Sequence, residues 1–357
     1  MENKSKSIQQ VKLKSLGWRP FFNKQVNDSE WGEFTPVRVV AEHRNAVIVH
    51  DGFNEHRIKL DHQLTNTLHQ RKPTTGDWLL VDLNSEQIWR ALNPENMMTR
   101  ISAGVSTGQK IQEQAIAANI DILFIVTSAN NEFSESRLER YLALAKKTAV
   151  RPVIVVTKSD LVEDAQSYRK RALAITDAPT VLVNAKEKDS VRELRRWLNI
   201  GNTIAVLGSS GVGKSTIVNT LAGTNLQETG IVRTTDNHGR HTTTSRSIHL
   251  LKDGPMILDT PGIRELTLAH SKEVLSEMFA DIEALFLLCR FSNCTHELEP
   301  DCAIRDALAK KVLDKRRFNN YQKLCAEHSF YTEAINGSDK NKYDSKIKKT
   351  TRGKQQK

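Results

Sequence analysis

The stretch that decides the fold is NTIAVLGSSGVGKSTIVNTLAG, Asn202–Gly223. An apolar run typical of a buried strand leads into a glycine-rich loop, and an amphipathic helical pattern follows. The loop, Gly208–Ser215, has the spacing G-x4-GKS, in which glycines allow backbone N–H groups to turn toward a phosphate at the start of a helix. A phosphate-binding loop in this context predicts a nucleotide-binding α/β domain.

The nucleotide chemistry expected of this loop follows from its residue types. Lys214 is predicted to bridge the β- and γ-phosphates, and the Ser215 hydroxyl to bind Mg2+. Downstream, the apolar run GPMILDTPG ends in Asp259–Gly262, where Asp259 can hold a water on Mg2+ and the Gly262 N–H can meet the γ-phosphate. The loop residues predicted to contact GTP are Gly208, Ser209, Ser210, Gly211, Val212, Gly213, Lys214, Ser215 and Thr216.

Two upstream loops carry the signal for guanine. RPVIVVTKSD ends in Asp160, whose carboxylate can accept both the ring N–H and the exocyclic amine of guanine, donors that adenine does not offer there. The stem of Lys158 can cover the base plane. PTVLVNAK, after the next apolar run, has the position of a second base loop. The residues predicted here are Thr157, Lys158, Ser159, Asp160, Asn184, Ala185 and Lys186.

The order of these motifs is unusual, because both base loops precede the phosphate loop and a usual GTPase has them last. Chain termini can move to another surface loop while the core stays unchanged. The strands DILFIVTSA, RPVIVVTKSD and PTVLVNAK alternate with helical patterns, which predicts a doubly wound parallel sheet. We therefore predict a circularly permuted P-loop GTPase domain over residues 99–265.

Shorter elements surround this domain. Five β-rich runs between residues 35 and 98 favour a small oligonucleotide-binding (OB) barrel, with an SH3-like barrel as the alternative. Residues 1–34 are predicted to be a basic, mostly irregular arm. A helical module is expected over 266–335, with residues 303–328 as one long basic amphipathic helix. The basic tail, 336–357, is expected to be disordered.

The composition bounds the partners. A net charge of +10 over 357 residues favours a polyanion such as nucleic acid. No apolar run reaches the length of a membrane span and the N-terminus does not read as a signal peptide, so we expect a cytoplasmic protein without a membrane partner. We also expect a monomer.

Three of the four cysteines cluster with a histidine in CRFSNCTHELEPDC, residues 289–302. Three thiolates and one imidazole at this spacing suit a structural tetrahedral Zn2+ site, because no ligand position is left open. The predicted ligands are Cys289, Cys294, His296 and Cys302. The alternative is a set of buried free cysteines. Cys325 is expected to be a packed helix residue.

The motifs GRHTTT (Gly239–Thr244), QAIAANIDILFIV, GSSGVGKST and CRFSNCTHELEPDC together resemble the RsgA family, also called YjeQ or YloQ, over residues 35–330. The resemblance implies a GTPase that binds the small ribosomal subunit and its rRNA, assists late maturation, and hydrolyses GTP to GDP with stimulation by the subunit. It also implies that His241 takes over from the catalytic glutamine, since Ile263 follows the DTPG glycine. Thr243 is the switch hydroxyl predicted to bind Mg2+, with Thr242 and Thr244 left open.

Two positions depart from the family pattern. Thr157 replaces an asparagine, and Asn184 replaces a serine. Thr157 keeps a hydroxyl but loses an amide that would brace the base loop and the phosphate loop, and we expect guanine selectivity to persist through Asp160. Alternatives from other classes are an RNA-binding regulator with a vestigial nucleotide site, a P-loop ATPase or kinase, and another permuted GTPase family.

Overall fold

A computed structural model describes residues 2–60, 71–101, 113–223, 247–251, 254–259, 271–330 and 332–333. The chain forms two compact units. The first contains residues 1–99, 115–138 and 148–266, and the second contains residues 100–114, 139–147 and 267–357. No helix among the described residues is both long enough and apolar enough to cross a lipid bilayer.

The nucleotide-binding part of the first unit is a sheet in the order β10-β9-β8-β11-β13-β12. Its strands are β8 (Ile122–Ser128), β9 (Arg151–Thr157), β10 (Thr180–Val183), β11 (Thr203–Leu207), β12 (Ser247–Leu250) and β13 (Met256–Asp259). All pair in parallel except β12, which runs antiparallel to β13. The predicted parallel sheet is confirmed, and the antiparallel edge strand β12 is an addition to it.

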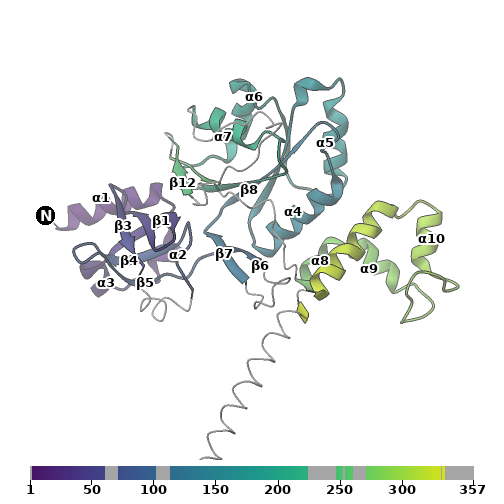
Figure 1. Ribbon diagram of the computed structural model, residues 1–357, viewed down its shortest axis with the longest axis horizontal. Helices are drawn as coiled ribbons and strands as arrows, with labels where there is room; N and C mark the ends of the chain where they lie inside the picture. The colour runs from purple at the N-terminus through teal and green to yellow at the C-terminus, as the bar shows by residue number, and fades with distance from the viewer. Residues whose placement is uncertain are drawn as a thin grey trace, which may run out of the picture. The chain divides into compact units, whose positions relative to one another are not determined.

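Helices pack around this sheet (Figure 1). They are α5 (Ala165–Leu173), α6 (Lys188–Arg192) and α7 (Lys214–Ala222), with 3-10 turns η2 (Ser159–Leu161) and η3 (Glu193–Trp197). Helix α4 (Glu135–Lys147) begins in the first unit and belongs to the second from Glu139 on. The strands are apolar on both faces, as β8 shows by being buried along its whole length. Phe124, Val153 and Ile204 are fully buried in the core between sheet and helices.

The five predicted barrel strands all form: β1 (Thr35–His43), β2 (Ala46–His50), β3 (Glu55–Lys59), β4 (Trp78–Asp82) and β5 (Gln87–Ala91). They pair antiparallel in the order β5-β4-β1-β2-β3 around a core that includes Val37, Val49 and Leu79. A single pairing, Ala41 with Ser247, joins β1 to β12. The barrel and the nucleotide-binding sheet are therefore hydrogen-bonded into one extended sheet.

The prediction of an irregular N-terminal arm is wrong. The arm forms α1 (Glu2–Ser15), α2 (Pro20–Asn23) and α3 (Asp28–Glu33). Apolar side chains explain the difference, because Leu13, Leu16 and Phe22 are fully buried and Trp18 packs edge-on against Trp78 of the barrel, at 4.8 Å between ring centroids. These aromatic contacts bury enough apolar surface to order the segment.

A fully buried arginine, Arg38 on β1, joins three parts of the first unit. Its guanidinium donates to the backbone oxygen of Leu16, to that of Asn119 at 3.0 Å, and to the Thr203 hydroxyl at 2.8 Å. Burial lowers the pKa of Arg38 to about 10, so the side chain stays charged near neutral pH. The barrel, the N-terminal helices and strand β11 therefore share one buried cation.

The second unit contains a helical module built from α8 (Lys272–Met278), α9 (Ala280–Phe286), α10 (Ala303–Ala309) and a helix over 315–330. The single long helix predicted over 303–328 is wrong, because the chain breaks at Lys311, which has a φ of 57°, and Asp314 caps the next helix by accepting from the Arg317 N–H at 2.9 Å. Two further strands, β6 (Met97–Ile101) and β7 (Glu113–Ala118), pair with each other alone.

Candidate nucleotide site and metal cluster

The phosphate loop joins β11 to α7, as predicted. Two of its glycines are required by the geometry. A Cβ on Gly208 would lie 2.2 Å from the Val126 backbone oxygen, and Gly213 has a φ of 94° at the start of α7. The loop can therefore approach β8 closely only because these positions have no side chain. Its backbone N–H groups, at the start of α7, are suited to binding an anion.

Two cations contact this loop. The Lys214 ammonium donates to the backbone oxygen of Gly208 at 2.8 Å and to that of Ser209, so it folds back over the loop. Arg137, in the first turns of α4, donates to the Ser209 hydroxyl and to the Glu132 backbone oxygen. Sequence reasoning missed Arg137, because nothing in its local pattern distinguishes it from an ordinary helix surface cation.

Thr157 ties the first base loop to the phosphate loop. Its hydroxyl donates to the Val212 backbone oxygen at 2.6 Å and lies 3.1 Å from the Thr127 backbone oxygen. The side chain is fully buried, and it sits 3.6 Å from where a Cβ on Gly213 would be. The expectation that the brace is lost with the asparagine amide is therefore wrong: the shorter hydroxyl makes the bridge itself.

The two base loops follow the carboxyl ends of β9 and β10. Lys158 adopts a left-handed conformation with a φ of 59°, which turns the chain into η2 and leaves Asp160 exposed. In the second loop, the Ala185 backbone oxygen accepts from the Thr220 hydroxyl of α7 at 2.8 Å, and the Asn184 side chain accepts from the Lys186 N–H at 3.1 Å. Three loops thus meet at the carboxyl edge of a parallel sheet, where ligands bind in such folds.

The remaining predicted nucleotide-site residues are partly outside the described residues. The switch residues His241 and Thr243, with Thr242 and Thr244, lie outside the described residues, and so does Gly262. Asp259 is the last residue of β13, beside β11. Ser215 and Thr216 stand in the first turn of α7, directly after Lys214.

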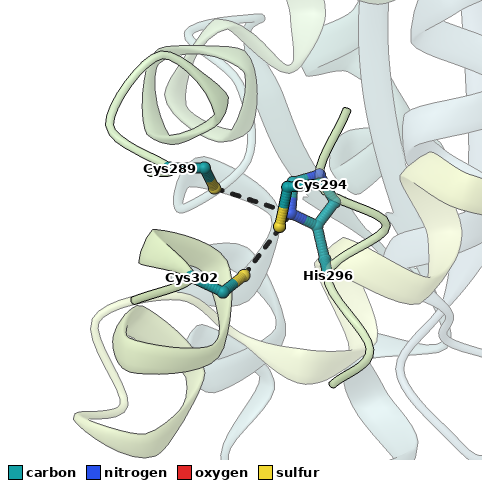
Figure 2. A group of neighbouring side chains, drawn as sticks. All are labelled: Cys289, Cys294, His296 and Cys302. Carbon is teal, nitrogen blue, oxygen red and sulfur yellow. Dashed lines mark hydrogen bonds between the residues drawn. The ribbon is translucent and has the colours of Figure 1, made fainter. Parts of the chain in front are cut away.

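The predicted metal ligands come together in the second unit. Figure 2 shows Cys289, Cys294, His296 and Cys302 converging, and their candidate ligand atoms all lie within 4.8 Å of one another. The Nδ1 atom of His296 lies 3.6 Å from the Cys289 sulfur and 3.5 Å from the Cys302 sulfur. Three sulfur atoms and one ring nitrogen in this arrangement can hold a metal ion.

The surroundings suit a metal ligand set. Burial lowers the pKa of His296, which favours the neutral imidazole that binds metals, and burial raises the pKa of Cys294 to about 11. Although burial opposes it, hydrogen bonds from the backbone of Arg305 and Ile304 hold the pKa of Cys302 below its ordinary value. A cation among these thiols would favour their deprotonated form, because the thiolate is the ligand.

The chain around the cluster fixes the ligand directions. The His296 ring stacks on Phe286 at 4.5 Å between centroids, with 10° between planes. Glu299 folds the intervening loop by accepting from the Thr295 N–H at 2.8 Å, the Thr295 hydroxyl at 2.6 Å and the Glu297 N–H at 3.1 Å. Cys325 packs in the same helical core and is not one of the clustered ligands, as predicted.

Comparison with known proteins identifies the family. A family model described as RsgA GTPase matches residues 96–269. A model described as ABC transporter matches residues 191–356, which include the phosphate loop that many nucleotide-binding families share.

Curated relatives cover most of the chain. The small ribosomal subunit biogenesis GTPase RsgA 2 of Vibrio parahaemolyticus is 43% identical, over 89% of this chain and 86% of its own. RsgA of Mesorhizobium japonicum is 39% identical, over 91% and 92%. The crystal structure of YjeQ from Thermotoga maritima matches 83% of this chain and 98% of its own, with a TM-score of 0.58 and 25% identity. The circularly permuted GTPase YloQ has the same fold, with a TM-score of 0.55 and 19% identity over 86% and 99%. With its permuted sheet, its phosphate loop and these relatives, the chain belongs to the RsgA GTPase family.

Proposed function

We propose that this chain is a GTPase that binds the small ribosomal subunit late in its maturation and hydrolyses GTP to GDP with stimulation by the subunit. The observation that carries the proposal is the linkage of the three nucleotide loops, in which Thr157 bonds to Val212 and Thr220 bonds to Ala185. Relatives named small ribosomal subunit biogenesis GTPases supply the choice of partner.

In this proposal each loop has one task. The phosphate loop N–H groups and Lys214 bind the β- and γ-phosphates, and the Ser215 hydroxyl binds Mg2+ together with Thr243 and, through water, Asp259. Asp160 accepts from the guanine edge, and Lys158 covers the base. Lys214 must leave the carbonyl oxygens of Gly208 and Ser209 to reach a phosphate.

His241 is proposed to orient the attacking water or to carry its proton, because Ile263 at the usual glutamine position has no polar atom. The variant His241→Ala should lower the turnover number and leave GDP affinity little changed. Unchanged turnover would remove His241 from the mechanism.

The clustered cysteines and histidine are proposed to hold one Zn2+ per chain. The donor set fits, since three thiols and one imidazole are the ligands of closed structural zinc sites. The ion would stabilise the helical module and leave the nucleotide chemistry to the first unit. Metal analysis of the purified chain should give one zinc per chain, and the zinc should be released only when a chelator is added.

We further propose that the protein contacts the rRNA of the subunit, a polyanion that the net charge of +10 favours. We also propose that it acts as a cytoplasmic monomer. RNA contacts of this kind are made largely to phosphates and to RNA shape.

The test is GTP hydrolysis by the full chain alone, with purified small subunits, and with large subunits as a control. Small subunits should raise the rate at least about tenfold, which corresponds to about 1.4 kcal/mol of added transition-state stabilisation. An equal rate in all three mixtures would overturn the proposed partner.

A further inference from the structure

A pocket lies in the first unit beside the second base loop, because one of its lining residues, Thr220, donates to the Ala185 backbone oxygen at 2.8 Å. Its volume is about 440 Å³, and its walls come from α6, η3, the end of α7 and the strand ends at Leu251 and Pro255. The phosphate loop is at the start of α7, whereas this pocket is at its end, at Leu221–Gly223. At 1.5 Å per residue, the two ends of α7 are about 12 Å apart, so the pocket does not include the phosphate loop.

The rim of the pocket is cationic. Lys188, Arg192 and Arg195 line it, at spacings of four and three residues that place them on one face of the α6–η3 segment. Lys188 and Arg192 are exposed and have no hydrogen bond or ion pair with another described residue. Among the described residues that line the pocket none is acidic, although Glu187, Asp189 and Glu193 belong to the same short segment.

The rest of the wall is apolar. Val191 and Leu221 are buried, with 1% and 9% of their surface exposed, and Leu198, Leu251 and Pro255 complete this side. A cationic rim over an apolar wall matches a ligand with one anionic end and one flat apolar end. A volume of this size is in the range that holds a small organic ligand.

We propose that this pocket binds one nucleotide of a single-stranded RNA, with its phosphate on Lys188 and Arg192 and its base against the apolar wall. Arginine and lysine are the usual contacts to RNA phosphates, and a base taken out of its stack can enter a pocket between apolar side chains. The inference deepens the proposed RNA contact by naming where a nucleotide enters, and it rests on that proposal only for the choice of RNA.

The same segment supplies a matched control. Arg196 is also exposed and lies four residues after Arg192, but it pairs with Glu193 at 3.3 Å and stacks over Trp197 at 5.0 Å, outside the pocket lining. Arg192→Glu and Arg196→Glu therefore change the net charge equally and differ in where the charge lies.

The experiment measures binding of a fluorescein-labelled ten-residue oligoadenylate to the full chain by anisotropy, with GDP and Mg2+ saturating the guanine site. Arg192→Glu should weaken binding about tenfold and lower the salt slope by about one unit, whereas Arg196→Glu should change affinity less than about twofold. Equal losses would assign the effect to overall charge and overturn the pocket, as would no loss in either variant.

Two further arms keep the outcome clear. Photo-crosslinking of an oligomer that carries 5-iodouracil should label peptides within residues 188–223, and labelling only elsewhere contradicts the site. Free AMP should compete with the oligomer if a mononucleotide suffices, and failure of AMP with retained oligomer binding assigns the site to RNA. Subunit-stimulated GTP hydrolysis is measured separately, so loss of this pocket and loss of the proposed function give different results.

Discussion

The nucleotide site and the metal cluster are held in place by different means. The nucleotide loops follow strands of a sheet whose core residues, such as Phe124 and Ile204, are fully buried, and hydroxyl-to-carbonyl hydrogen bonds connect the loops. The cluster is held by a loop over a small helical core, and its residues Cys289, Cys294 and His296 are only half-buried. The packed sheet fixes the shape of the nucleotide site. The shape of the cysteine-histidine cluster is expected to depend on a metal ion bound by its four side chains.

The largest expected effect therefore concerns metal removal. With chelator, or in Cys294→Ser, hydrogen exchange should lose protection over residues 280–325 by at least about 3 kcal/mol of opening free energy, because without a metal the loop is held only by a small helical core and by solvent-exposed hydrogen bonds such as those of Glu299. Protection over residues 203–223 should stay unchanged. The comparison fails if the chelated protein keeps full protection over 280–325.

The next effect concerns a buried carboxylate in the second unit. Glu139 is 1% exposed; it pairs with Arg316 and Arg317, each at 3.0 Å, and accepts from the Asn320 amide at 2.5 Å. Arg317 also pairs with Asp281 at 2.7 Å. Glu139→Ala leaves partly buried guanidinium groups without this partner, so it should destabilise the helical module by about 3 kcal/mol in urea unfolding.

The control is Glu193→Ala, which removes an exposed ion pair with Arg196 and should change stability by less than about 1 kcal/mol. Equal losses of unfolding free energy in the two variants would show that burial does not determine how much these ion pairs contribute to stability.

A third prediction sharpens the nucleotide side of the comparison. Thr157→Val keeps the shape of the side chain and removes the bond to Val212, so GDP affinity should fall about tenfold, or about 1.4 kcal/mol. Thr157→Ser should keep most of the affinity, and Thr157→Asn should match or exceed it. Isothermal titration of GDP measures all three, and a valine variant with unchanged affinity would dismiss the brace.

The smallest effect is a pH dependence in the first unit. Arg90, 2.7 Å from Glu30, lowers the pKa of that carboxyl to about 2. A lowered folded-state pKa contributes stability above the unfolded value, about 4.3, and loses it as pH falls toward 2. Glu30→Gln should therefore cost about 1 kcal/mol at pH 6, and this difference should shrink steadily between pH 4.5 and 2 in urea unfolding. A difference independent of pH would contradict the pairing.

How much the sequence predicts depends on whether the signal is local. The phosphate loop and the predicted metal ligands are short motifs with fixed spacing, the five barrel strands are continuous β-rich runs, and the structure places all three as expected. Thr157 is predicted only in part. The sequence shows that it carries a hydroxyl, but the hydrogen bond to Val212 depends on how closely β9 approaches the phosphate loop.

The N-terminal arm was predicted wrongly because the partners that order it are far away in sequence. The N-terminal helices are ordered by contacts such as Trp18 with Trp78, and Arg38 is buried because Asn119 and Thr203 accept from it. The break at Lys311 is a local feature, but a continuous amphipathic pattern on both sides concealed it.

The central claim is that a permuted sheet presents Asp160 to a guanine base, and one substitution tests it most directly. Asp160→Asn replaces a carboxylate oxygen, which accepts a hydrogen bond, by an amide nitrogen, which donates one. The variant side chain should therefore donate to the second carbonyl of xanthine, which stands where guanine has its amine. The control is Asp164→Asn, four residues on, where asparagine can still cap α5 as Asp164 does by accepting from the Ser167 N–H at 3.0 Å. In titrations of GDP and xanthosine diphosphate, the account predicts that Asp160→Asn reverses the preference by at least about 100-fold, or about 2.7 kcal/mol, while Asp164→Asn binds like the unmodified chain. An Asp160→Asn chain that still prefers GDP would contradict it.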